Sequence, residues 1–163
     1  MIEFGFLLFL LVLLLVLLRR RKRLHAPRLA VIDGSNVIYW KPDACTLEPV
    51  KDVIRQLRRA GYKPHVIFDA NAGYLVADRY LDGGAFAKRL GIPEHSAYVV
   101  PRGQSADPYI LRLAEEQAAI VVSRDKFRQW TAQFPAATQP DRLVSGGYDE
   151  GGFWLDLSRL RRK

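Results

Sequence analysis

Short apolar runs alternate with amphipathic helical patterns along most of this chain, and that alternation limits the possible fold more than any other feature. Strands that are apolar throughout are buried on both faces, so the pattern predicts an α/β fold whose mainly parallel sheet has helices on both sides. For such a three-layer α/β/α arrangement the usual doubly wound strand order is 3-2-1-4-5. The expected elements are a strand at Leu29–Ile32, a helix at Leu47–Ala60, a strand at Val66–Phe68, a helix near Ala85–Leu90, a strand at Ala97–Val100, a helix at Ser105–Gln117, a strand at Ile120–Ser123, a helix at Lys126–Gln133, a strand at Arg142–Val144, and a hairpin or extended edge through Phe153–Leu157.

An apolar segment precedes this domain. Residues 4–18 contain no charge and no proline, and five consecutive basic residues, 19–23, follow them. This order predicts a single transmembrane helix over residues 2–18, a basic juxtamembrane linker over residues 19–28 and one folded domain over residues 29–163. A cleaved secretory signal would have its basic residues before the apolar run. By the positive-inside rule, we expect a single-pass protein of the cell membrane whose C-terminal domain is cytoplasmic.

Composition limits the kinds of site and of partner that the folded domain can have. The single cysteine, Cys45, excludes an internal disulfide and a zinc site built from several cysteines. The net charge of the chain is +8; without residues 19–23 and Glu3, 20 basic and 16 acidic side chains remain. The domain therefore stays basic, which is compatible with a polyanionic partner such as nucleic acid.

Four aspartates follow the predicted strands or begin a helix beside them. Asp33 comes directly after the first strand, and residues 34–36, Gly-Ser-Asn, suit a tight turn into a helix. Asp69 ends the second strand, Asp125 follows the fourth, and Asp107 starts the helix that leads into the fourth. Taken singly, each could simply cap a helix or a turn. With the strand order 3-2-1-4-5, however, Asp33, Asp107 and Asp125 should converge at the carboxyl edge of the sheet.

Converging carboxylates repel one another and need a cation to remain ionised. Oxygen ligands with no Cys or His partners point to Mg²⁺ or Mn²⁺ rather than zinc. Such an ion lowers the pKa of bound water and stabilises charge on a phosphate, which is the chemistry of phosphodiester hydrolysis. We therefore expect Asp33, Asp107 and Asp125 to bind the metal, with Asp69 as a further candidate.

Three segments taken together resemble a known nuclease family. Residues 31–37 (VIDGSNV), 105–111 (SADPYIL) and 120–128 (IVVSRDKFR) look like the NYN branch of the PIN-like nucleases, specifically the Regnase-type endoribonuclease domain. The resemblance spans about residues 29–157 and implies a PIN-like fold and Mg²⁺- or Mn²⁺-dependent cleavage of single-stranded or loop RNA. The residues that match the catalytic positions of the family are Asp33, Asp107 and Asp125 as metal-binding acids, Asn36 in the first motif, and Ser123 as the small hydroxyl residue before the last acid.

The chain departs from the family pattern at Ala106. Regnase-type members often carry two adjacent acids where this chain has Ala106-Asp107, so the number of metals stays open, as does replacement of the missing acid by Asp69 or Asp82. The CCCH zinc finger that accompanies some relatives is absent from the sequence. A binding module that tethers RNA or a protein at the membrane without cutting is the alternative to a ribonuclease. A phosphatase of the haloacid dehalogenase type is disfavoured, because it needs an acid at the position of Ser35.

Basic and aromatic side chains near the acids suggest how RNA would bind. The basic residues expected to hold phosphates are Arg102, Arg124, Lys126 and Arg128. Tyr39, Trp40 and Tyr74 are candidates for base stacking, whereas the helical spacing of Trp130 from Phe127 and Phe134 favours a place in the core. The predicted partners are thus RNA and, through residues 2–23, the membrane; the oligomeric state is left open, a homo-oligomer included.

Overall fold

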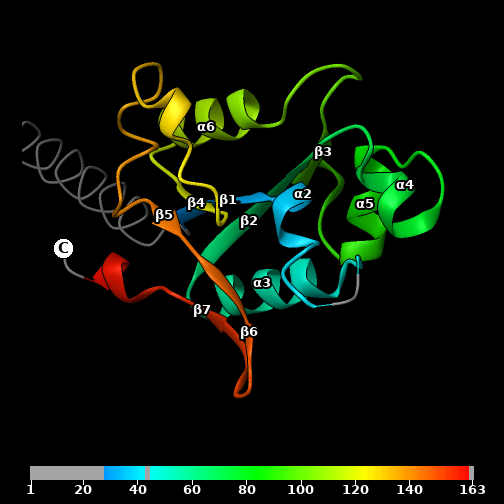
Figure 1. Ribbon diagram of the computed structural model, residues 1–163, viewed down its shortest axis with the longest axis horizontal. Coiled ribbons are helices and arrows are strands. Elements are labelled where there is room, and N and C mark those ends of the chain that lie inside the picture. Colours follow the sequence, from blue (N-terminus) through cyan, green and yellow to red (C-terminus); the bar gives the residue numbers. More distant parts are fainter. Residues whose placement is uncertain (1–27, 43–44, 162–163) are drawn as a thin grey trace, which may run out of the picture.

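The computed structural model describes residues 28–42 and 45–161 (Figure 1). The predicted transmembrane segment, residues 2–18, and all but the last residue of the linker lie outside the described residues. Within the part that is described, no helix is long and apolar enough to cross a membrane.

A five-stranded parallel sheet forms the centre of the domain, with the strand order β3-β2-β1-β4-β5. This confirms the α/β class and the strand order predicted from the sequence. The strands are β1 (Arg28–Asp33), β2 (Tyr62–Phe68), β3 (Ala97–Val99), β4 (Ile120–Val122) and β5 (Leu143–Val144).

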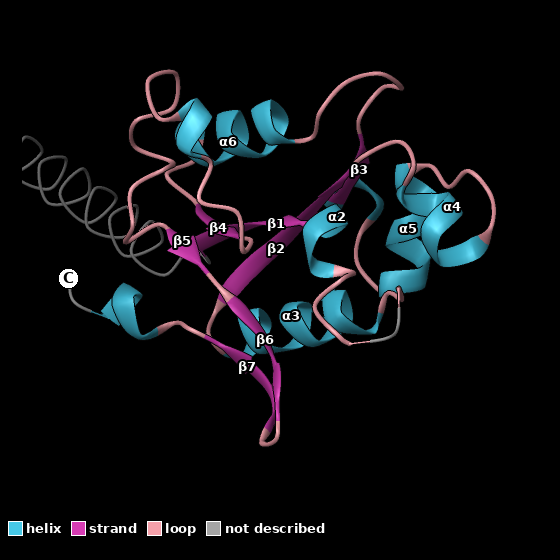
Figure 2. Cartoon of the chain, in the orientation of Figure 1, coloured by secondary structure: helices cyan, strands magenta, loops and turns pink. Residues whose placement is uncertain are grey.

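Helices cover both faces of the sheet, as Figures 1 and 2 show: α6 lies on one side, and α3 and α5 lie on the other. The helices are α2 (Gly34–Val37), α3 (Glu48–Arg59), α4 (Ala72–Ala77), α5 (Gly83–Leu90) and α6 (Asp107–Glu116), with 3-10 turns η1 (Glu94–Ser96), η2 (Arg128–Trp130) and η3 (Ser158–Arg161).

Strand β1 separates two hydrophobic cores because successive side chains of a strand point to opposite faces. Ile32 packs into the core beneath α3 and α5, whereas Val31 packs into the core beneath α6, and neither side chain is exposed. Asp33 lies two residues after Val31 and so falls on the α6 face. The pleat of one strand thus directs the first predicted acid toward the helix that begins with Asp107.

Two local predictions were wrong. The helix expected at Lys126–Gln133 is only the 3-10 turn η2, because Phe127 has a left-handed backbone (φ 50°) and its N–H donates to Asp125 Oδ1 at 2.7 Å. Such an Asx turn competes with helix initiation. Helix α4 lies in the stretch between Asp69 and the helix near Ala85, where no helix was predicted; it lasts six residues and ends where Asp78 adopts the left-handed conformation.

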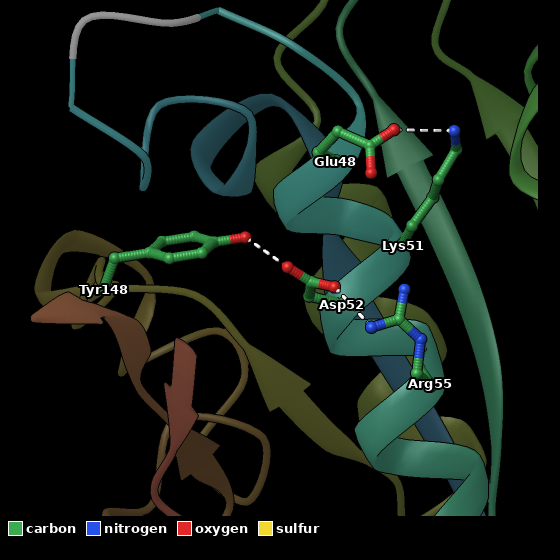
Figure 3. Close-up of polar contacts among 5 residues, drawn as sticks. All are labelled: Glu48, Lys51, Asp52, Arg55 and Tyr148. Atoms are coloured by element: carbon green, nitrogen blue, oxygen red, sulfur yellow. Dashed lines mark hydrogen bonds and ion pairs between the residues drawn. The ribbon is translucent and has the colours of Figure 1, made fainter. Parts of the chain in front are cut away.

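The C-terminal strands form a separate antiparallel hairpin and do not extend the main sheet. β6 (Gly146–Asp149) pairs with β7 (Gly152–Leu155), and β7 contacts α3. Figure 3 shows the polar part of this docking: Tyr148 donates a hydrogen bond of 2.5 Å to Asp52 Oδ2, while Asp52 Oδ1 pairs with Arg55 at 2.8 Å. One carboxylate therefore joins the hairpin to α3.

Removing the Tyr148 hydroxyl should weaken this docking. Burial and the hydrogen bond to Asp52 hold the pKa of Tyr148 well above its ordinary value, so the phenol stays a donor at neutral pH. We expect Tyr148→Phe to lower the free energy of unfolding by about 1.5–3 kcal/mol, as for hydrogen bonds to charged acceptors. Urea denaturation measures this, with Tyr80→Phe as the control because Tyr80 is exposed. Equal stability of the two variants would contradict a role for the hydroxyl in holding the hairpin.

Candidate active site

Asp33 is the buried centre of the site. It lies at the carboxyl end of β1 with only 6% of its surface exposed. Its Oδ2 accepts a hydrogen bond from Ser123 Oγ at 2.9 Å, and its Oδ1 accepts one from the backbone N–H of Asn36 at 3.1 Å. Burial raises the pKa of Asp33 to about 7; these two hydrogen bonds oppose the shift, and the charges of Asp107 and Asp69 add to it.

Ser123 connects Asp33 with the turn that carries Asp125. It follows β4, the strand beside β1, and its Oγ accepts a hydrogen bond from the backbone N–H of Asp125 at 3.1 Å. The Ser123 hydroxyl therefore donates a hydrogen bond to Asp33 and accepts one from the backbone of Asp125, and both of these acids are predicted metal ligands. This fixes the spacing between the ends of the two strands.

Asp107 begins α6 and is half-buried. Its Oδ2 accepts a hydrogen bond from the indole N–H of Trp130 at 3.1 Å. Burial raises the pKa of Asp107, the hydrogen bond from Trp130 opposes this, and the charges of Asp125 and Asp69 add to it. Asp107 thus interacts electrostatically with all three other acids, since its charge also raises the pKa of Asp33.

Asp69 belongs to the same group of acids, and Asp82 does not. Asp69 Oδ1 accepts a hydrogen bond from the N–H of Ala106 at 2.9 Å, and its charge acts on both Asp33 and Asp107. Asp82 instead caps α5, accepting from Ala85 N–H at 2.7 Å. Ala106, where the family pattern has a further acid, is 2% exposed and packs into the core beneath α6.

Asn36 acts as a connector through its side-chain oxygen. Its Oδ1 accepts hydrogen bonds from the indole N–H of Trp40 at 2.8 Å and from the backbone N–H of Arg124 at 3.0 Å. It therefore ties α2 to the segment after β4. Trp40 is only 3% exposed, so the expectation that it could stack on a base was wrong.

The four predicted phosphate-binding residues lie beside two cavities. Arg124, Lys126 and Arg128 line a cavity of about 480 Å³ together with Ser123 and Asp125, at the ends of β4 and β5. The fourth, Arg102, lines a cavity of about 800 Å³ at the ends of β2 and β3. All four side chains are exposed.

Arg124 differs from the other three in being held by the protein. Its Nε donates to the carbonyl of Gly146 at 2.8 Å, and its guanidinium lies 5.3 Å from the centre of the Trp40 ring. The side chain thus braces the β6–β7 hairpin against the active edge.

Comparison with known proteins identifies the domain. Residues 26–145 match the model of the Zc3h12a-like ribonuclease NYN domain. The chain belongs to this family. No curated protein sequence matches the chain significantly. Among solved structures it is similar to nuclear proteinaceous RNase P 2 (PRORP2) from A. thaliana, with a TM-score of 0.61 and 18% identity over 85% of this chain. A second structure of Arabidopsis thaliana PRORP2 gives a TM-score of 0.52 and 18% identity over 91% of this chain.

The NYN domain covers only part of those larger proteins, 31% and 34% of their chains. At this level of identity the likeness shows the fold alone. It supports the NYN/PIN-like α/β architecture that the sequence predicts.

The acids of the NYN domain offer carboxylate oxygens, the ligand type that hard divalent cations prefer. In the described ranges, 28–42 and 45–161, no group of three or more His, Cys, Asp or Glu side chains could hold a metal ion as they stand. Burial and the charges of neighbouring acids nevertheless raise the pKa of Asp33 and of Asp107, and nearby negative charge without compensation favours a bound cation. The assignment of Asp33, Asp107 and Asp125 as ligands stays a prediction.

Sequence reasoning did not reveal the role of Trp130 in the candidate active site of the NYN domain. Its helical spacing suggested a core position, and it does pack against Phe134, with ring centres 6.2 Å apart. Its indole N–H, however, positions the Asp107 carboxylate. The available signal was chemical: a partly buried tryptophan needs an acceptor for its N–H.

Proposed function

We propose that this protein is a divalent-metal-dependent ribonuclease that hydrolyses RNA phosphodiester bonds. The observation that carries the proposal is the buried Asp33 carboxylate at the sheet edge, with a pKa raised to about 7 and with Asp69 and Asp107 close enough to influence it. A protein retains a buried acid beside two others at a cost in stability, so such a cluster is typical of a functional site. The ribonuclease family of the domain supports the same conclusion.

The roles of the residues follow from their contacts. Asp33, Asp107 and Asp125 would hold Mg²⁺ or Mn²⁺, with Asp69 beside them. When bound, such an ion supplies an activated water and stabilises negative charge on the phosphate. Ser123 and Asn36 act as positioning residues: Ser123 orients Asp33 and the Asp125 turn, and Asn36 holds the backbone of Arg124.

The exposed basic residues are the proposed contacts for the phosphates of the RNA substrate. Lys126 and Arg128 line the cavity that also contains Asp125, so a phosphate bound there lies next to the acids. Phosphate contacts of this kind position a nucleic acid without reading its sequence. We further propose that residues 2–18 anchor the enzyme in the cell membrane and that the basic residues 19–23 keep the nuclease domain on the cytoplasmic side.

Metal removal tests this function. The full chain should cleave single-stranded RNA with Mn²⁺ or Mg²⁺, and excess EDTA should abolish cleavage until the metal is restored. Gel analysis of end-labelled RNA follows both reactions. Cleavage that persists in EDTA would contradict metal dependence, whereas RNA binding without cleavage in any divalent metal would show a binding module instead.

A further inference from the structure

The larger of the two cavities beside the acids has features that phosphate binding alone does not require. It has a volume of about 800 Å³, within the range of small-molecule sites, and lies between α4 and the loop that joins β3 to α6. Its lining includes Asp69, Asn71, Tyr74, Tyr80, Arg102 and Gln104.

Two exposed tyrosines meet at this cavity. Tyr74 is 54% exposed and Tyr80 is 55% exposed, although large hydrophobic side chains are usually buried where the fold allows it. Single exposed aromatics are common on protein surfaces, but two that line one hollow form a candidate stacking platform. Neither belongs to the buried part of a hydrophobic core. Both rings are thus available to a ligand in the cavity.

The polar lining complements the aromatic rings. Asn71 and Gln104 carry amide groups, which can hydrogen-bond with base edges, and the hydroxyl of Tyr109 donates to Gln104 Oε1 and fixes its orientation. Arg102 adds a cation suited to phosphate. Rings, amides and one cation are the groups that recognise a nucleotide of unpaired nucleic acid.

Asp69 connects the cavity to the candidate active site. It lines the cavity, and its charge acts on Asp33 and Asp107. On the other side of the acids, at the ends of β4 and β5, lies the cavity with Lys126 and Arg128. A single strand of RNA that crosses the sheet edge would therefore meet tyrosines on one side of the acids and basic residues on the other.

We propose that the cavity at Tyr74 and Tyr80 binds one nucleobase of single-stranded RNA next to the scissile phosphate. The base stacks on the tyrosine rings, and Arg102 contacts the adjoining phosphate. The position of this subsite next to the cut rests on the proposed function. The subsite itself requires only that the chain bind RNA through a base, whether or not it cleaves the RNA. Duplex RNA, whose bases are stacked inside the helix, cannot fill it.

Alanine and phenylalanine variants of the full chain test the subsite. Binding of a short single-stranded RNA of mixed sequence is measured by fluorescence anisotropy in EDTA, so that cleavage does not interfere. We expect Tyr74→Ala and Tyr80→Ala each to weaken binding about 5- to 150-fold, the usual range for loss of one stacking partner, and Tyr74→Phe to retain it. Trp154→Ala is the control, because Trp154 is also an exposed aromatic side chain, at 40%, and does not line the cavity.

Abasic RNA separates stacking from indirect effects. A single abasic nucleotide is placed at each position of the RNA in turn. At one position the wild type should lose about as much affinity as Tyr74→Ala does, and the two losses should not add. Additive losses at every position, or a loss with Trp154→Ala equal to that with Tyr74→Ala, would overturn the proposal.

Cleavage assays with Mn²⁺ test the proposed ribonuclease function separately from the base subsite. If the wild type cleaves RNA but the losses of affinity are additive, the base subsite is contradicted and the ribonuclease function stands. If the losses of affinity are non-additive but no metal supports cleavage, the ribonuclease function is contradicted and the base subsite stands.

Discussion

Asp33→Asn should abolish metal-dependent cleavage and at the same time make the protein more stable at pH 8. Loss of an outer partner of a metal ligand typically costs about 10- to 100-fold in activity or affinity, and loss of the ligand itself should cost more. The fold should accept the amide well. Asparagine Oδ1 can still accept from Asn36 N–H, and Ser123 Oγ can accept from the new NH₂ group in place of donating.

The gain in stability follows from the direction of the pKa shift. The pKa of Asp33 rises from 3.8 to about 7 on folding, so the folded state binds this proton more tightly than the unfolded state. Ionisation therefore costs folding free energy. The cost is absent below about pH 4, grows as the pH rises, and is complete above about pH 7. At 1.36 kcal/mol per pKa unit, its upper limit is about 4 kcal/mol, and we expect a gain of about 2–4 kcal/mol for Asp33→Asn at pH 8.

Urea denaturation in EDTA at a series of pH values measures this gain. The advantage of Asp33→Asn over the wild type should narrow steadily toward pH 4. Asp149→Asn serves as the control, since Asp149 is exposed and its contact with Gly151 N–H survives in an asparagine. A variant less stable than the wild type at pH 8, or a difference that does not change with pH, would show that ionised Asp33 is not a destabilising group.

Gly34→Ala should destabilise the fold and disrupt the site together. A Cβ at position 34 would lie 2.3 Å from Cε1 of Phe68, far inside van der Waals contact. Phe68 cannot move easily, because it is fully buried and stacks on Phe86 with ring centres 3.9 Å apart. Overpacking of this kind typically costs about 1–3 kcal/mol, and a clash with a buried ring belongs at the upper end. Displacement of α2 would also shift Ser35, whose Oγ accepts from Asp69 N–H, so activity should fall as well.

Gly84→Ala provides the comparison for Gly34→Ala. Gly84 also lies in a helix, α5, and the nearest atom to its new Cβ would be the end of the flexible Glu94 side chain, at 3.2 Å. That substitution should be neutral or slightly stabilising, because alanine is the better helix former. The double variant Gly34→Ala, Phe68→Leu should recover part of the lost stability. If it recovers none, the clash with Phe68 is not the cause.

The sequence was sufficient for the parts of the fold that depend on regular hydrophobic patterns. Val31 and Ile32 are apolar on successive faces, which is typical of a strand inside a parallel sheet with helices on both sides. The strand order followed from that class of fold, and it placed Asp33, Asp69, Asp107 and Asp125 at one edge. Their electrostatic influence on one another agrees with this placement.

Features that depend on single side-chain contacts could not be predicted in the same way. The apolar spacing around Phe127 indicated a helix, but one hydrogen bond to Asp125 and a left-handed backbone replaced it with a turn. Trp40 could have faced solvent or the protein; the Asn36 side chain provides the acceptor that allows it to be buried. The secondary-structure propensity of a local segment does not reveal such hydrogen-bond partners.

The most direct test of the central claim is a crystal structure of the protein soaked in Mn²⁺, with the metal located by anomalous scattering. The proposed site predicts a peak at the carboxyl edge of the sheet, about 2.1 Å from oxygens of Asp33, Asp107 and Asp125, and Asp69 as the side chain nearest to any second peak. A peak away from these carboxylates, or none at a Mn²⁺ concentration that supports cleavage, would contradict the metal site on which the proposed ribonuclease depends.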